Sequence, residues 1–403
     1  MKPLTPTERR LIEPIDQARM LAQTESWCAI NSGTGNLPGL ARQAAVLAEA
    51  FAVLPGAIAL RAAVPVAAVD AEGREVELSH GSHLVLRVRP GAERRFLLTG
   101  HMDTVYPADH PFRHGRWLDA DRLNAPGAAD MKGGIAVILA ALQAFEASAA
   151  AAMVGYDVLI NSDEETGSLS SAALIADLAH GKAAALTYEP SALPDGTLAH
   201  ARGGSGNYSV VVTGRSAHAG RNPEEGRNAI VAAAALALEL KAIEAADLTV
   251  NPARIDGGAG NNVVPDHAVL RFNIRPASVA AADRFEDQLR HLLSNLEADH
   301  EVSTRVHGGI TRPPKPVDAR AQKLFDLVRR SGADLGQTIG WRPSGGVCDG
   351  NNIAACGVPV VDTMGARGGA IHSPDEYLIA SSLAERAALS ALVLHRLALG
   401  EPA

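Results

Sequence analysis

The sequence is poor in the residues that mark several classes of protein. Aromatic residues make up 4% of its 403 positions, so a folded core has to rely on aliphatic side chains. Cys28, Cys348 and Cys356 are too few and too scattered for a disulfide framework or a thiolate metal cage, which indicates a reducing compartment. With a net charge of −8, the chain also lacks the basic character that would attract nucleic acid or an anionic membrane.

Long apolar segments are missing too. The first twenty residues contain charged side chains such as Glu8, Arg9 and Arg10 and no apolar run of signal-peptide length. No stretch reaches the ~18 uncharged apolar residues that a membrane span requires. We therefore expect a cytoplasmic protein with neither a nucleic-acid nor a membrane partner. What the chain has instead is a hydrophobic content of 47%, which over this length predicts two domains.

Helical and strand patterns alternate along the first 200 residues. Such alternation is typical of a largely parallel sheet with helices on both faces, so we predict an α/β fold. A return strand of the same sheet is expected near the end of the chain, at Val358–Asp362. The other expected elements are strands at Leu84–Val88, Arg95–Thr99, Tyr156–Asn161 and Ala184–Thr187, and helices at Leu40–Val53, Gly134–Ala147 and Ser170–Ala179.

The pattern changes after Arg202, where a different kind of domain begins. The order strand, helix, strand, helix, strand over Tyr208–Val306 indicates a small inserted α+β domain of the ferredoxin-like type. A stiff proline-rich connection at Thr311–Pro316 marks its end. We therefore predict a catalytic domain formed by residues 1–202 and 317–403, interrupted by an inserted lid at residues 203–316.

Potential metal ligands follow three of the expected strands. One strand leads to His101, the next leads to Asp163, Glu164 and Glu165, and a third leads to Glu189. The carboxyl ends of parallel strands meet at one edge of a sheet, where ligands bind in such folds. Three adjacent carboxylates repel one another unless a cation lies between them, although a solvated acidic loop is the common alternative. The placement predicts a metal site, with one glutamate as ligand and the other as general base for the attacking water.

Two further acidic residues fit the same site, although each has a structural alternative. Asp130 precedes Gly133 and Gly134, and it is either a helix N-cap or a carboxylate that bridges two metal ions ~3.5–4 Å apart. The two glycines favour the bridge, because they indicate close backbone approach rather than simple capping. Asp103 either occupies an ordinary turn or accepts the second N–H of His101, which would fix the orientation of that ring.

The inserted domain carries three polar residues that have ordinary explanations one by one. His218 fits a structural histidine, Asn262 a turn residue and Arg275 a surface cation. Together, an imidazole, an amide and a guanidinium would suit an anionic group such as a carboxylate.

Taken in order, these motifs resemble the M20 family of metallopeptidases, and most of all its glutamate carboxypeptidase branch. The similar segments span roughly residues 96–377, and their combination is far more specific than any one motif. The segments are Thr99–Pro107, Gly127–Gly134, Asn161–Gly167, Tyr188–Pro190, Gly214–Gly220, Asn261–Pro265, Gly345–Asn351 and Ile371–Ser373.

The resemblance implies a centre of two zinc ions, for which cobalt or manganese could substitute. Asp130 would bridge the two ions, and the peptide bond after it, to Met131, would be cis. The other ligands would be His101 and Glu189 for one ion, and Glu165 and His372 for the second.

The resemblance also implies catalytic and substrate-binding residues. Glu164 would be the general base and Asp103 the partner of His101. His218 would stabilise the oxyanion in the active site of the partner subunit, within a homodimer formed through the inserted domain. Contacts with the substrate are expected from Asn262, Arg275 and Gly346. Apart from what the resemblance implies, Arg367 in the loop before His372 is expected to add a cation near the substrate.

These implications favour a dizinc hydrolase that cleaves an amide or peptide bond next to a free α-carboxylate of a small substrate. The alternatives left open are an N-acyl-amino-acid deacylase, of the acetylornithine or succinyl-diaminopimelate type, a dipeptidase, and a non-catalytic metal-binding scaffold. Two departures from the family pattern, Ala125 in place of a glycine and Cys348 in place of a hydroxyl residue, leave the metal site intact but weaken any transfer of substrate specificity.

Overall fold

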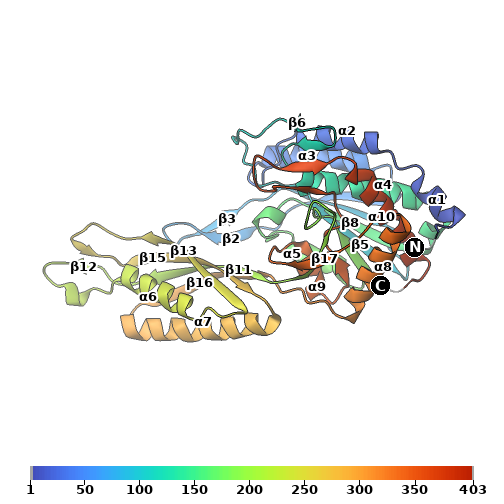
Figure 1. Ribbon diagram of the computed structural model, residues 1–403. Helices are drawn as coiled ribbons and strands as arrows, with labels where there is room; N and C mark the ends of the chain where they lie inside the picture. The colour runs from blue at the N-terminus through green and yellow to red at the C-terminus, as the bar shows by residue number, and fades with distance from the viewer. Residues whose placement is uncertain (1–2, 402–403) are drawn as a thin grey trace. The chain divides into compact units, whose positions relative to one another are not determined.

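The computed structural model describes residues 3–401, which divide into two compact units (Figure 1). The first unit comprises Ser79–Ala201 together with the described residues before Pro65 and after Pro316. The second unit comprises Pro65–Leu78 and Arg202–Pro316. Each unit has a sheet and a hydrophobic core of its own.

The first unit is built around a six-stranded sheet in the order β1, β4, β8, β5, β9, β18. Neighbouring strands from β8 to β18 run parallel, and β4 runs antiparallel to both of its neighbours. The prediction of an α/β fold with a mostly parallel central sheet is confirmed. The strands are β1 (Ala57–Arg61), β4 (His83–Val88), β5 (Arg95–His101), β8 (Gly155–Asn161), β9 (Ala184–Thr187) and β18 (Val360–Val361).

Helices cover both faces of this sheet because its central strands are apolar on both sides. Successive side chains of a strand point to opposite faces. In β5, Leu98 therefore packs in one core and Leu97 in another. The first core includes α2 (Gln17–Cys28), α3 (Leu37–Phe51), α4 (Gly133–Glu146), α8 (Ala319–Asp334) and α10 (Ser382–Ala398), and the second includes α5 (Ala172–Ala179) and α9 (Asp349–Ala355).

Helix α4 is apolar on nearly all sides and is buried in the first core. Together with the turn before it, it forms a stretch, Ala128–Glu146, that is long and apolar enough to cross a membrane by length and composition. However, 89% of its most apolar window is buried inside the protein. A helix that is hydrophobic all round and buried in this way is a core helix.

The remaining elements of the first unit are short. Helix α1 (Pro6–Ile12) lies near the N-terminus. The unit also has two small sheets besides the central one. One of them has four strands in the order β19, β20, β7, β6, and the other pairs β10 with β17. Their strands are β6 (Arg116–Trp117), β7 (Arg122–Asn124), β10 (Leu198–Arg202), β17 (Trp341–Ser344), β19 (Gly368–Gly369) and β20 (Tyr377–Ile379).

The second unit has a four-stranded antiparallel sheet in the order β13, β15, β11, β16, with α6 and α7 packed against it (Figure 1). Stacked aromatic rings of Tyr208 and Phe272 lie between the sheet and Phe285 of α7. The βαββαβ order is that of ferredoxin-like units. The elements are β11 (Ser205–Thr213), α6 (Ala229–Ala242), β13 (Leu248–Gly257), β15 (His267–Pro276), α7 (Val279–His300) and β16 (Ser303–Arg312), with a short pair β12 (Ala217–His218) and β14 (Val263–Val264).

Strand β13 was missing from the predicted order of this unit, which had three strands instead of four. Its sequence does not alternate cleanly, because it contains Pro252 and ends at Gly257. Pro252 lies where the register with β15 shifts, on an edge strand. A proline is tolerated at such a place, because no neighbouring strand needs its missing N–H.

The hairpin of β2 (Val66–Val69) and β3 (Glu75–Leu78) also belongs to the second unit, although sequence order had placed it in the first catalytic segment. The Arg271 guanidinium donates hydrogen bonds to the carbonyls of Val69 (3.0 Å) and Asp70 (2.8 Å). Val69 also packs against Val211 and Val269 of the sheet. These contacts are made across the sequence, so no local pattern could have revealed them.

Candidate metal centre

Three neighbouring parallel strands deliver histidine and acidic side chains to one edge of the sheet. His101 is the last residue of β5 and pairs in register with Asn161, the last residue of β8. Asp163–Glu165 follow β8, and Glu189 follows β9, the other neighbour of β5. All of them therefore start beyond the carboxyl ends of the strands, where open α/β sheets bind ligands.

His101, Asp130, Glu165, Glu189 and His372 form one cluster around the Asp130 carboxylate. Its Oδ1 is 3.1 Å from His101 Nε2, and its Oδ2 is 3.3 Å from His372 Nε2. Glu189 Oε2 is 3.7 Å from His101 Nε2, and Glu165 Oε2 is 3.1 Å from His372 Nε2. Two groups, each made of one histidine and one glutamate, thus share Asp130.

A tight turn before α4 brings Asp130 to this position. Gly127 has a φ of 71°, in the left-handed region that favours glycine, and the Asp130–Met131 peptide is cis, as the family resemblance implied. Gly134 lies against the chain that continues from β9: a Cβ on Gly134 would be 2.2 Å from the carbonyl oxygen of Tyr188. The glycine therefore allows the start of α4 to approach the segment that carries Glu189.

The three consecutive acidic residues after β8 have different surroundings. The Asp163 carboxylate accepts hydrogen bonds from the hydroxyls of Ser170 (2.8 Å) and Ser171 (2.7 Å), so it closes its own turn. Glu165 faces His372, as given above. Glu164 lies beside the other half of the cluster, where its carboxylate, His101 and Glu189 each offer one ligand atom within 4.8 Å of the others.

Asp103 connects the strand end at His101 to this acidic turn. His101 Nδ1 is 3.0 Å from the Asp103 carbonyl oxygen and 3.4 Å from its carboxylate. The same carboxylate accepts the backbone N–H groups of Glu164 and Glu165, both at 3.2 Å, and the Thr34 hydroxyl at 2.8 Å. Asp103 therefore holds the imidazole and both glutamates in fixed relative positions.

The charges of the cluster favour an added cation. Burial lowers the pKa of His101, but Glu189, Asp103 and Asp130 outweigh it and raise that pKa well above its ordinary value. Hydrogen bonds to Asp130 and Glu165 raise the pKa of His372 to about 11. Burial and the charge of Asp130 raise the pKa of Glu165 to about 7. The raised pKa values of the two histidines and of Glu165 reflect an excess of negative charge in the cluster, which a divalent ion would balance.

The donor atoms fit one or more divalent metal ions. Imidazole nitrogen and carboxylate oxygen suit zinc, cobalt and manganese. In addition, the second ring nitrogen of His101 faces the carbonyl and carboxylate of Asp103, an outer contact that is usual for a metal-bound histidine.

The candidate residues of the second unit do not form one site within that unit. His218 lies on β12, next to Asn262, whose carbonyl accepts the N–H of the residue after His218. Arg275 lies at the far end of β15, eight residues beyond His267 and thus about 26 Å along the strand. Its guanidinium donates to the Asn273 side chain (2.9 Å). His218 pairs with Val263, four residues before the start of β15, whereas Arg275 lies near the other end of that strand. His218 and Arg275 of one chain therefore do not meet at one small anion.

Gly346 and Arg367 lie in loops of the first unit. Gly346 follows β17, and its N–H donates to the Ser344 hydroxyl (3.2 Å). Arg367 donates to the Pro194 carbonyl (2.8 Å) and pairs with Glu385 of α10 (3.1 Å). A substrate carboxylate would have to compete with Glu385 for this guanidinium.

Glu376, which lies four residues after His372, was not expected to take part in the site. Its carboxylate is buried and accepts the backbone N–H of Asp130 (3.0 Å), among other donors. Burial and the charge of Asp130 raise the pKa of Glu376 to about 7. Asp349 was also missed as a single residue, although its segment was noted: its carboxylate accepts the Asn161 amide (2.8 Å) at the end of β8. Neither contact follows a periodic pattern, so the sequence alone offered no signal for it.

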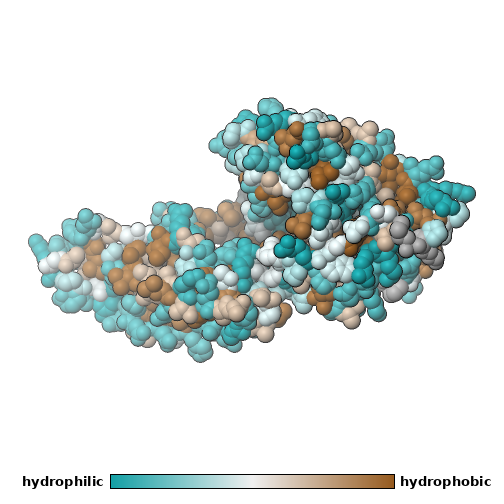
Figure 2. Space-filling view, in the orientation of Figure 1, coloured by the Kyte–Doolittle hydropathy of each residue, from teal (hydrophilic) through white to brown (hydrophobic). Residues whose placement is uncertain are grey.

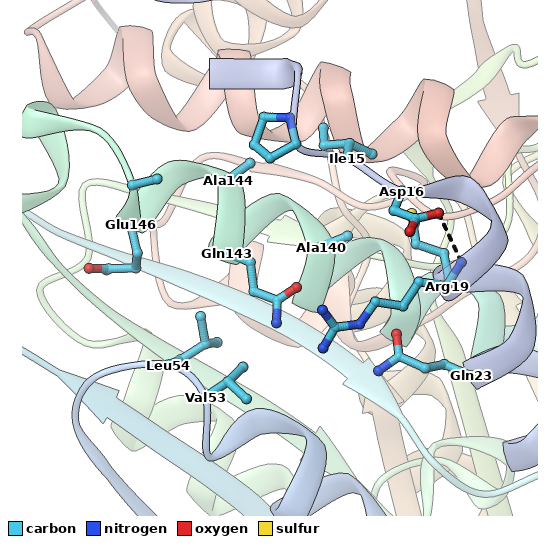
Figure 3. A pocket seen from close by; sticks show the side chains of 13 residues that line it. Ile15, Asp16, Arg19, Gln23, Val53, Leu54, Ala140, Gln143, Ala144 and Glu146 are labelled. Carbon is cyan, nitrogen blue, oxygen red and sulfur yellow. Dashed lines mark hydrogen bonds between the residues drawn. The ribbon is translucent and has the colours of Figure 1, made fainter. Parts of the chain in front are cut away.

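A separate cavity of about 430 Å³ lies between α2 and α4 of the first unit (Figure 3). Arg19, Gln23 and Gln143 point toward it, and Glu146 at its side is paired with Arg89. None of the cluster residues lines this cavity, so its position gives no support to a role in the chemistry of the centre.

Comparison with known proteins agrees with the chemistry of the centre. The model of peptidase family M20/M25/M40 matches residues 97–396. Carboxypeptidase G2 of Pseudomonas sp. (strain RS-16) is 28% identical over 396 residues, which cover 96% of this chain and 91% of the relative. Succinyl-diaminopimelate desuccinylase of Psychrobacter sp. (strain PRwf-1) is 28% identical over 296 residues, covering 68% of this chain and 71% of the relative.

A solved structure gives the same result for the fold. The tripeptidase of Staphylococcus aureus subsp. aureus Mu50 superposes with a TM-score of 0.72 at 23% identity, covering 96% of this chain and 99% of the other. The family model spans well over half of the sequence and includes every residue of the cluster. The chain therefore belongs to peptidase family M20/M25/M40, and it is a metal-dependent hydrolase.

Proposed function

We propose that this protein is a two-metal amidohydrolase that cleaves an amide or peptide bond next to a free α-carboxylate. The observation that carries the proposal is the placement of Asp130, whose two oxygens each face a different histidine, at 3.1 and 3.3 Å. A carboxylate used on both sides in this way suits a bridge between two metal ions.

The proposed ligands divide between two sites. His101, Asp130 and Glu189 would hold one ion, and Asp130, Glu165 and His372 the other. Zinc is the proposed metal, and cobalt or manganese would suit the same donors. When bound, the metal ions would supply Lewis-acid polarisation of the scissile carbonyl and make the attacking water more acidic.

Glu164 is proposed as the general base. Its carboxylate takes a proton from the water that attacks the carbonyl carbon, and it returns a proton to the amine nitrogen as the C–N bond breaks. Asp103 supports this step because it fixes the backbone N–H of Glu164. His218, as a donor to the developing oxyanion, is proposed to act in the active site of the partner subunit.

The substrate class is proposed from the relatives. The full-length similarity to carboxypeptidase G2 favours release of an amino acid with a free α-carboxylate. Asn262, Arg275, Gly346 and Arg367 are the proposed substrate contacts. The similarity to succinyl-diaminopimelate desuccinylases favours, as the second candidate, a deacylase of N-acyl amino acids. A dipeptidase is a third variant of the same chemistry, and a non-catalytic scaffold is disfavoured by the complete donor set with Glu164 beside it.

A homodimer formed through the second unit is part of the proposal. The outward face of α6 exposes Val231 (52%) and Leu238 (75%), which lie about two turns apart along the helix, with Ala234 and Ala235 between them. Figure 2 shows apolar side chains gathered over this helix. Residues at these spacings share one helix face. An apolar face of this kind suits a symmetric contact with a second copy.

The proposal is tested with a panel of N-acyl amino acids and dipeptides, including N-acyl glutamates and acetylornithine. Zinc-loaded and chelated protein are compared side by side, and released amino acids are detected by mass spectrometry. We expect chelator-sensitive release from one subset, which also decides between carboxypeptidase, deacylase and dipeptidase. No release from any member by protein with two bound zinc ions would refute the proposed substrate class.

A further inference from the structure

Glu376 is a buried carboxylate that receives four hydrogen bonds near the centre. Its Oε1 accepts the backbone N–H groups of Ala129 and Asp130, both at 3.0 Å. Its Oε2 accepts the backbone N–H of Gly127 (3.1 Å) and the Tyr106 hydroxyl (2.8 Å). The two oxygens of this side chain therefore bind three backbone N–H groups of one turn and one hydroxyl group.

The bonded groups belong to different parts of the chain. Gly127, Ala129 and Asp130 form the turn that presents the bridging carboxylate, whereas Glu376 lies four residues beyond His372. The Tyr106 hydroxyl also lies 2.8 Å from the Ser373 carbonyl, the residue next to His372. Glu376 and Tyr106 thus join the segment that carries Asp130 to the segment that carries His372.

The backbone of Glu376 is itself anchored. The Asn124 amide donates to the Glu376 carbonyl (2.6 Å) and to the Pro374 carbonyl (3.0 Å). Because both the main chain and the side chain of Glu376 are held, its position can fix the turn around Asp130.

We propose that Glu376 is a positioning residue of the centre, which sets the separation of Asp130 and His372 and thereby the affinity of the second metal position. This inference rests on the proposed two-metal function, because it concerns the ligands of that centre. Glu376 touches neither substrate nor metal in this role and acts through the Asp130 turn.

The chemistry requires a carboxylate at this position. Both oxygens of a carboxylate accept hydrogen bonds, but an amide of the same shape has one acceptor and one donor group. In a Glu376→Gln variant, one pair of donors would therefore face the NH2 group, and at least two of the four hydrogen bonds would be lost. A buried donor that loses its acceptor is costly, so the turn should shift rather than keep this arrangement.

A purely structural role is the alternative, and metal affinity separates the two. A residue that only stabilises the fold would lower the melting temperature without changing how tightly folded protein binds zinc. Mutation of a residue that contacts a metal ligand from outside typically weakens metal binding by about 10–100-fold.

The experiment measures zinc binding to the full chain by competition with a chromophoric chelator, together with the melting temperature of the metal-free protein. Glu376→Gln is expected to weaken the second zinc ion by about 10-fold or more. Tyr106→Phe keeps the carboxylate and removes one donor, so a smaller loss of the same sign is expected. Glu8→Gln is the matched control, because Glu8 is also a buried carboxylate of the first unit but its partners are Arg396 and Thr5, which are not part of the cluster. Its zinc affinity should stay within about twofold of the wild type.

Wild-type zinc affinity in Glu376→Gln would overturn the inference, as would an equal loss in Glu8→Gln. If Glu376→Gln does not fold, Tyr106→Phe decides, and unchanged zinc affinity there refutes the inference. A wild-type chain that binds no metal refutes the proposed function as well. A wild-type chain that binds two zinc ions and hydrolyses a substrate, with variants that bind equally well, refutes the positioning role alone.

Discussion

At the scale of single residues, Asp103 shows how one carboxylate can serve two strands. It contacts the imidazole of His101 at the end of β5 and accepts the N–H groups of Glu164 and Glu165 after β8. The two glutamates are therefore held through their backbone as well as through their side chains. Loss of one glutamate side chain should leave the other one in place.

Glu164→Ala is expected to lower turnover by at least about 10² while both metal ions stay bound. The general base would be lost, whereas all five proposed ligands would remain. The measurement is turnover on the best substrate of the panel, with metal content determined on the same sample.

Asp163→Asn is the matched control for this variant. Asp163 is the adjacent residue, but its carboxylate is occupied by Ser170 and Ser171, so we expect lower stability and nearly normal turnover of the folded protein. Full activity of Glu164→Ala would show that another group takes the proton.

His101, Glu165 and Glu189 could be predicted because each follows an apolar strand, and Asp130 because two glycines follow it, which are local signals. His372 was expected only from the resemblance to a known family. Glu376 could not be predicted in this way, because its partners at Gly127–Asp130 are nearly 250 positions earlier in the sequence. Arg367 could be recognised as a cation near the site, but its partner Glu385 could not, because the two residues meet only when α10 packs against the loop.

At the scale of elements, α1 is attached by an ion pair in addition to the packing of Leu11 against α4 and α10. Arg396 of α10 donates to Glu8 of α1 (2.9 Å) and to Asp334 at the end of α8 (2.9 Å). Glu8 also accepts the N–H of Thr5 (2.8 Å), within the cap of its own helix. Burial acts to raise the pKa of Glu8, but Thr5 and Arg396 outweigh it and hold that pKa below its ordinary value.

Glu8→Gln is expected to lower the free energy of unfolding by about 1–3 kcal/mol at pH 7, the usual scale for a hydrogen bond to a charged group. A lowered pKa means that the contribution of Glu8 is present above its ordinary pKa of about 4.3 and is lost as the pH falls through the folded-state value. The difference between wild type and variant should therefore shrink toward zero in acid.

Urea unfolding monitored by tryptophan fluorescence measures this difference. Trp27, Trp117 and Trp341 all belong to the first unit, so the signal reports the unit that contains Glu8. A difference that stays constant from pH 7 to pH 3 would contradict the assignment of the effect to the ionised carboxylate.

Most elements could be predicted from the sequence where periodicity was clear, as in the strands β5, β8 and β9. Strand β13 escaped because Pro252 interrupts its pattern, and the hairpin β2–β3 was placed in the wrong unit because Arg271, about 200 positions away, holds it. Local sequence patterns predict single helices and strands. The unit to which a strand or hairpin belongs depends on contacts with residues far away in the sequence.

At the scale of the whole molecule, Leu238→Glu tests the proposed dimer. A charge at this exposed position on α6 would have to be desolvated in an apolar contact, so the variant should be monomeric. Light scattering after size-exclusion chromatography measures the mass, and Glu239→Gln, on the neighbouring exposed position, is the control that should leave the dimer intact. A wild-type monomer, or a Leu238→Glu dimer, would contradict an interface at α6.

The order of the proposed ligands along the chain also has a consequence for biosynthesis. His101, Asp130 and Glu189 all precede Arg202–Pro316, the larger segment of the second unit, whereas His372 is 271 positions after His101. At about 5–20 residues per second, the last ligand is synthesised on the order of 10–50 s after the first. The ribosome therefore completes the donors of one metal position before it begins the larger segment of the second unit, and it supplies the final histidine of the other position only after that segment has been made.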